Sequence, residues 1–167
     1  AIIELKSTEQ FNRTLKEVNP NVDFQVIDPE KIGVNTIAEL QEQIENGGLV
    51  VITGDRTSAR SRSRIIREKF LGKEADFPYG VFVLALLLKA PTYYVFGLRT
   101  KTASLRPKYH IFVEKSKVDF ERPSSKRDEK IHALCKEFVV KLEKYCIQFP
   151  YQWYNFYNFW KLEDEAN

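Results

Sequence analysis

A short apolar run that ends in a glycine and two opposite charges is the feature that most restricts how this chain folds. Residues 49–53 are apolar and mostly β-branched, the pattern of a buried strand. The run ends at Gly54-Asp55-Arg56, where the chain can turn and present a carboxylate and a guanidinium. Open α/β sheets bind ligands outside the carboxyl ends of their strands. The run therefore predicts a central strand with a candidate ligand site at its end.

The preceding residues predict alternating strands and helices. Residues 2–5 and 24–28 are predicted strands. A helix capped by Ser7 or Thr8 is predicted to carry an apolar stripe, and a second, over residues 36–45, is predicted to start after Asn35. That stripe consists of Phe11, Leu15 and Val18. With the run at 49–53 the order is βαβαβ, which favours a mainly parallel sheet covered by helices.

A basic segment follows the charged turn. Residues 56–73 contain seven Lys or Arg residues against one acid, Glu68. Arg60, Arg62 and Arg64 alternate, so an extended segment would turn all three to one side. They are candidates to contact phosphates, an acidic carrier protein or anionic lipid headgroups, each basic residue contributing about 1 kcal/mol at such a surface. The alternative is a solvated charged loop.

The second half of the chain predicts a helix, two strands and a long helix. Residues 81–88 are predicted to form a core helix, and Gly80 at its start would expose backbone N–H groups to an anion or simply allow tight packing. Residues 92–98 are the next predicted strand. Residues 109–120 alternate, with Tyr109, Ile111 and Val113 on one face, and read as an antiparallel edge strand.

Residues 128–148 give the clearest helix, with Ser125 as its candidate N-cap and Pro150 after its end. Its predicted apolar face consists of Ile131, Leu134, Cys135, Phe138, Val139, Leu142, Tyr145 and Cys146. The sequence thus predicts one α/β domain over residues 1–160. We expect a central, mainly parallel (mixed) sheet flanked by helices, with an antiparallel edge strand, a long C-terminal helix and a frayed end at 161–167.

Composition excludes several classes of protein. The two cysteines show no disulfide framework and no zinc spacing, and we expect them to be buried apolar residues. No apolar run reaches the roughly 18 residues that a membrane span needs. The sequence contains no Met and starts abruptly inside a predicted strand, so we expect a fragment of a longer protein. Residues 151–160 are highly aromatic, which suits either the membrane interface or packing over a sheet edge.

Three stretches together resemble the bacterial lipid A biosynthesis lauroyl/myristoyl acyltransferases of the lysophospholipid acyltransferase superfamily. The first is Gly54-Asp55-Arg56 after its apolar strand. The second is Phe70-Leu71-Gly72 followed by Phe77-Pro78-Tyr79-Gly80 and Ala85-Leu86. The third is Pro150-Tyr151-Gln152-Trp153 with Phe159-Trp160, where Tyr154 to Asn158 replace basic residues of the family. The resemblance covers roughly residues 1–160.

The resemblance implies transfer of an acyl group from a thioester of acyl-carrier protein or coenzyme A to a hydroxyl of a glycolipid or lysophospholipid. It implies no metal and no cofactor beyond that co-substrate. It also implies a peripheral location on the cytoplasmic face of the inner membrane, with anionic lipid or a phosphorylated glycolipid acceptor as partner. The residues expected to bind substrate are Asp55, Arg56, Arg60, Arg62, Arg64 and Gly80.

The family's catalytic pair, a His followed five residues later by an acid, is not expected in this chain. His110 has Lys115 at that spacing. His132 has Glu137, but five residues of helix place the acid about 140° around from the His. We read that match as chance and expect the pair before Ala1. The fragment alone is therefore predicted to be inactive, and Arg56→Ala in the complete enzyme to lower activity at least tenfold, about 1.4 kcal/mol.

Two other functions remain as alternatives. The first is a non-catalytic basic module that binds anionic lipid or an acidic partner protein. The second is nucleic-acid binding, because Arg and Ser lie close to aromatic residues. The net charge of only +3 and the α/β order weigh against nucleic acid.

Overall fold

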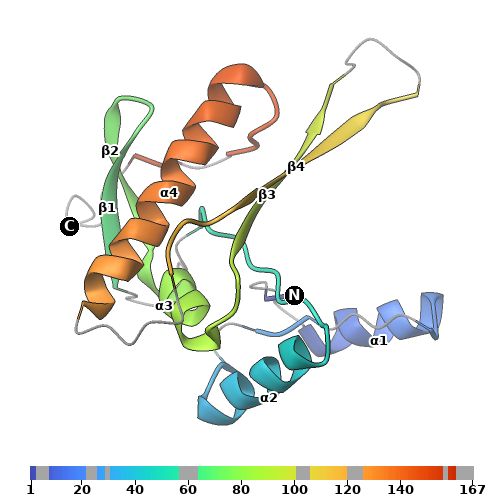
Figure 1. The fold of residues 1–167 in the computed structure, drawn as a ribbon. Helices are drawn as coiled ribbons and strands as arrows, with labels where there is room; N and C mark the ends of the chain where they lie inside the picture. The colour runs from blue at the N-terminus through green and yellow to red at the C-terminus, as the bar shows by residue number, and fades with distance from the viewer. Residues whose placement is uncertain are drawn as a thin grey trace.

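Most of the molecule packs against one long helix, α4 (Arg127–Gln148), which lies between two β-hairpins (Figure 1). The structure is a computed structural model that describes residues 1–2, 8–21, 26–28, 31–56, 64–100, 106–119, 126–155 and 158–160. Seven of the eight predicted apolar positions of α4 are buried, and Phe138 is partly buried. The 3.6-residue period therefore predicted this helix and its buried face correctly.

The first hairpin joins β1 (Ile65–Phe70) to antiparallel β2 (Lys73–Pro78). Its two-residue turn places Leu71 at φ 49° and Gly72 at φ 84°, the left-handed values that such turns require. The Leu71 N–H donates to Glu143 Oε1 of α4 over 2.7 Å, which holds the turn against the helix. Phe70 and Phe77 of this hairpin are fully buried against α4.

The second hairpin joins β3 (Tyr93–Arg99) to antiparallel β4 (Tyr109–Lys115). It runs past α4 and extends away from the body of the molecule (Figure 1). Phe96 and Phe112 pack on Tyr145 of α4, with ring centroids 4.6 and 4.9 Å apart respectively. The strand predicted at residues 109–120, its antiparallel pairing and its alternating faces are confirmed for Tyr109–Lys115, but residues 116–119 lie outside the strand.

Helix α3 (Tyr79–Leu88) connects the two cores. Phe82 packs in the core around α4, whereas Leu84 packs with Ile2 and Leu40. Leu40 belongs to α2 (Val34–Glu45), and α1 (Thr8–Val18) projects to one side (Figure 1). These three helices agree with the sequence prediction, except that Gly33 rather than Asn35 occupies the N-cap of α2. Ser7 and Ser125 lie outside the described residues.

The predicted central parallel sheet is wrong. The structure contains two antiparallel two-stranded sheets among its described residues. Ile2 forms isolated parallel bridges to Ile27 and Ile52, and no ladder extends from them in the described chain. Leu49 and Val51 are 89% and 59% exposed. A strand of a parallel sheet is buried on both faces, and residues 49–53 are not.

The second half of the basic segment contains a strand that was not predicted from the sequence. Residues 65–70 form β1. Arg67 pairs with Asp76 directly across the hairpin, with Nε 2.8 Å from Oδ1. Part of the basic charge is therefore neutralised within the hairpin. Among the helices of the described residues, none has the length and apolar character needed to cross a membrane.

Candidate ligand site beside Asp55 and Arg56

A half-open, largely apolar hollow lies between β3 and the C-terminal end of α4. Its volume is about 210 Å³. It is lined by Val95, Phe96, Gly97, Leu98, Leu142, Tyr145, Cys146, Phe149, Gln152 and Trp153. The lining comes from three elements: one strand, the last two turns of α4 and the segment after α4. Such a surface can accept a small apolar group.

Asp55 and Arg56 lie next to the wall of this hollow. The indole Nε1 of Trp153 donates to Asp55 Oδ2 over 3.1 Å. Arg56 Nη2 donates to the carbonyl oxygen of Tyr154 over 3.4 Å, and Arg56 itself is exposed. The two predicted site residues therefore contact the aromatic segment that closes the hollow. The sequence suggested their chemistry but gave no sign of this contact.

Gly54 allows the chain carrying Asp55 to approach α4 closely. A Cβ atom at Gly54 would lie 3.0 Å from Cζ of Phe138 and 3.2 Å from its Cε1. Those distances are shorter than ordinary van der Waals contact, so the ring occupies the space that any side chain would need. Close approach, rather than an unusual backbone angle, requires glycine at this position.

Gln152 fixes the other side of the hollow. Its side-chain Oε1 accepts from the Arg99 N–H over 2.7 Å, and its Nε2 donates to the Arg99 carbonyl over 2.7 Å. These paired bonds attach the segment after α4 to the end of β3. From the sequence, Gln152 was expected only as part of the Pro150-Tyr151-Gln152-Trp153 stretch and not as a residue that joins two segments.

The local electrostatics make the hollow a poor place for a thiolate. Burial raises the pKa of the Cys146 thiol to about 11, and the negative charge of Asp55 adds to that effect. Cys146 is 7% exposed and lines the hollow. The thiol is therefore protonated at neutral pH and behaves as an apolar wall atom. Both cysteines are buried and unpaired, as predicted.

The remaining predicted site residues do not gather at the hollow. The Arg64 guanidinium stacks on the Tyr79 ring, 4.5 Å from its centroid, and the Tyr79 hydroxyl donates to Asp128 over 2.8 Å. Asp128 belongs to the first turn of α4, at the opposite end from the hollow. Gly80 is the second residue of α3 and is exposed. Arg60 and Arg62 lie outside the described residues.

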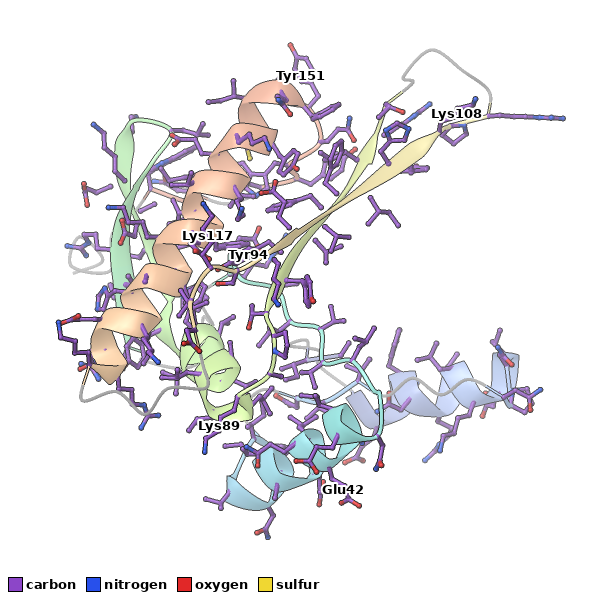
Figure 2. All side chains as sticks on the ribbon, viewed as in Figure 1. Glu42, Lys89, Tyr94, Lys108, Lys117 and Tyr151 are labelled. Atoms are coloured by element: carbon purple, nitrogen blue, oxygen red, sulfur yellow. The ribbon has the colours of Figure 1, made fainter. Side chains whose placement is uncertain are left out.

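Glu137, the acid that follows His132 by five residues, bonds to the second hairpin and the residues after it. Glu137 accepts from the Ser116 hydroxyl over 2.6 Å, from the Tyr94 hydroxyl over 3.1 Å and from the Lys117 N–H. It therefore ties α4 to the second hairpin, and Figure 2 shows Tyr94 and Lys117 near the middle of α4. His132 is exposed. Neither His132 nor His110 lines the hollow.

The aromatic segment packs over the first hairpin instead of presenting all its rings to solvent. Phe70 is surrounded by Trp153, Phe159 and Trp160, at centroid distances of 5.1, 5.5 and 6.2 Å respectively. Trp160 Nε1 also donates to the Phe70 carbonyl over 3.2 Å. Tyr151 and Tyr154 are exposed. The sequence left two roles open for this segment, the membrane interface and packing over a sheet edge. Trp153 and Trp160 pack over the first hairpin.

Comparison with models of known protein families and with curated protein sequences finds no match to this chain. Within the described residues, no group of three His, Cys, Asp or Glu side chains could hold a metal ion.

Proposed function

We propose that this chain supplies the acyl-binding part of an acyltransferase that works at a membrane surface. The reaction class, the thioester donor and the lipid acceptor come from the sequence resemblance. The observation that carries the proposal is the position of Asp55 and Arg56 beside an apolar hollow. An acyl chain needs an apolar surface, and a neighbouring phosphate needs a cationic group beside that surface.

The size of the hollow limits what it can hold. If a methylene occupies about the volume of a water molecule, roughly 30 Å³, a hollow of about 210 Å³ accepts about seven carbons. A lauroyl chain would therefore bury one end and leave the rest along the open side. The exposed guanidinium of Arg56 offers the planar pair of donors that suits a phosphate.

The proposal gives this chain a binding role. Neither histidine lines the hollow, and burial keeps the Cys146 thiol protonated. General-base catalysis needs a proton acceptor within hydrogen-bond reach of the attacking hydroxyl. We expect the purified chain to bind an acyl thioester without turning it over. The proposed location is the cytoplasmic face of the inner membrane, with acyl-carrier protein or coenzyme A as the acyl donor.

Trp153 allows a direct test, because it lines the hollow. In a Trp160→Phe background it is the single tryptophan of the sequence. Titration with lauroyl-CoA is expected to change its emission with saturation, whereas CoA without an acyl chain is expected to bind at least tenfold more weakly. Cys146→Leu places extra carbon atoms in the hollow and is expected to weaken lauroyl-CoA binding at least fivefold.

Arg56→Ala is expected to weaken lauroyl-CoA binding about tenfold, the loss of roughly 1.4 kcal/mol from a charge-assisted contact. Arg13→Ala removes an exposed guanidinium from α1 and is the matched control. Equal binding of CoA and lauroyl-CoA, or no response of Trp153, would contradict the proposal. Hydrolysis or transfer of the acyl group by this chain alone would contradict the purely binding role.

A further inference from the structure

The second hairpin exposes an apolar face that nothing in the described chain covers. We define its outer face as Tyr93, Val95, Tyr109, Ile111 and Val113. Each of these side chains is between 51% and 70% exposed. The opposite face of the same hairpin packs on α4 through Phe96 and Phe112. One face of the hairpin therefore forms the core, and the other presents apolar surface to the outside.

The strand register makes the outer face continuous. Val95 lies opposite Val113, and Gly97 opposite Ile111, so the centre of the face is entirely apolar. Each end pairs a tyrosine with a cation, Tyr93 with Lys115 and Tyr109 with Arg99. Directly opposed residues are close neighbours on one face of an antiparallel pair. Tyrosine and basic residues around an apolar centre are typical of surfaces at the membrane interface.

The charged residues paired on the outer face within the described chain are basic. Lys115 lies opposite Tyr93 and Arg99 opposite Tyr109, and Figure 2 shows Lys108 extending away from the far end of the hairpin. The acidic residue of β4, Glu114, lies on the opposite face. There its carboxylate bonds to Lys141, to Lys144 and to the Tyr145 hydroxyl. The outer face is therefore apolar with a basic border.

We propose that the outer face of the β3–β4 hairpin docks on an anionic membrane surface. The apolar side chains enter the headgroup boundary, and the bordering cations contact lipid phosphates. Because this sheet has only two strands in the described chain, each strand keeps one backbone edge that needs water. That requirement limits docking to the interface and excludes insertion into the hydrocarbon.

Charge also favours a membrane over a second copy of the chain. Two outer faces brought together would place two sets of the same cations against each other, which costs free energy at an interface. An anionic bilayer instead complements every cation of the border, and each contributes about a fivefold gain in binding. This inference deepens the membrane association in the proposed function. Val95 and Gly97 also line the hollow, whereas the residues changed in the test below do not.

Vesicle sedimentation tests the assignment with the whole 167-residue chain. We expect binding to vesicles of phosphatidylcholine with 30% phosphatidylglycerol, and at least tenfold weaker binding to phosphatidylcholine alone. Ile111→Glu with Val113→Glu is expected to reduce binding to the anionic vesicles at least tenfold. Val18→Glu with Leu49→Glu is the matched control. It adds the same charge at residues that are 81% and 89% exposed and lie elsewhere.

Lys108→Gln with Lys115→Gln is expected to reduce binding about twenty-five-fold. Lys16→Gln with Lys136→Gln removes two exposed lysines from helices and is expected to change binding much less. Circular dichroism verifies that each variant is folded.

Equal losses from the outer-face and control variants would overturn the proposal. So would a dimer in analytical ultracentrifugation that Ile111→Glu dissociates. If the unaltered chain failed to bind the anionic vesicles but still bound lauroyl-CoA at Trp153, the docking face would be contradicted and the acyl site would stand.

Discussion

The indole of Trp153 and the carboxylate of Asp55 are hydrogen-bonded over 3.1 Å, although 98 positions separate them in the sequence. The bond connects the turn after residue 53 to the segment that follows α4. Both groups are partly buried. The candidate site therefore exists only when the two distant segments are folded together.

A double-mutant cycle measures this connection. Trp153→Phe removes the indole N–H and keeps an aromatic ring, and Asp55→Ala removes the acceptor. Hydrogen bonds to charged groups contribute about 1.5–3 kcal/mol, with less expected in a partly buried position. We expect each single change to lower the free energy of unfolding by about 1 kcal/mol and the double change to cost less than the sum. Urea unfolding followed by circular dichroism gives the coupling, and strict additivity would show that the bond contributes nothing.

Two glycine-to-alanine substitutions are expected to have opposite effects. Gly54→Ala brings a Cβ atom within 3.0 Å of the Phe138 ring and should destabilise the fold by about 1–2 kcal/mol. Gly80→Ala meets nothing within 4 Å and lies in a helix, so it should stabilise the protein by about 0.5 kcal/mol. Adding Phe138→Leu to Gly54→Ala should recover part of the loss. A neutral Gly54→Ala would show that the ring moves away freely.

The Cys146 thiol should react slowly in the folded protein. A pKa near 11 instead of the ordinary 9.0 leaves about a hundredfold less thiolate at pH 8. In a Cys135→Ala background, we expect Ellman's reagent to react at least a hundredfold more slowly with folded than with urea-unfolded protein. Asp55→Asn removes a negative neighbour and should raise the folded rate a few-fold. A folded rate close to the unfolded one would contradict the burial of this thiol.

The ionised carboxylate of Glu114 should stabilise the fold near neutral pH, and this stabilisation should be lost in acid. Its hydrogen bond with Lys141 and then that with Tyr145 lower its pKa from 4.5 to about 2. A carboxyl group with a lowered pKa stabilises the fold above its unfolded pKa, and this contribution is lost as pH falls towards 2. The carboxylate is 29% exposed, so screening leaves about 1–2 kcal/mol. Glu114→Gln should flatten the stability profile between pH 5 and pH 2. Glu42→Gln, at an exposed position of α2, is the matched control.

The helices and the second hairpin could be predicted from sequence because their apolar periods are local. The face of α4 follows the helical repeat, and β4 alternates residue by residue. The first hairpin was missed because charged residues such as Arg67 and Asp76 fill its positions and neutralise each other across the strands. Its turn places Leu71 in a left-handed conformation that leucine rarely adopts, so no familiar turn signal was visible.

The sheet prediction failed for a different reason. The apolar composition of residues 49–53 correctly marked a segment that touches the core through Ile52, but it did not reveal how much of the run faces solvent. At the candidate site, Asp55 and Arg56 could be predicted from the sequence, but their partners could not. The contacts with Trp153 and Tyr154 and the clamp by Gln152 all join residues far apart in the chain. No local pattern encodes them.

The packing of Phe70 has a consequence for synthesis on the ribosome. Trp160, whose indole bonds to the Phe70 carbonyl, is made 90 residues later. At about 5–20 residues per second, the ribosome needs roughly 5–18 s to cover that distance. During this interval the apolar side of the β1–β2 hairpin cannot be covered by its final partners. The nascent chain therefore presents a surface suited to chaperones, and truncation before residue 153 should leave a product prone to aggregation.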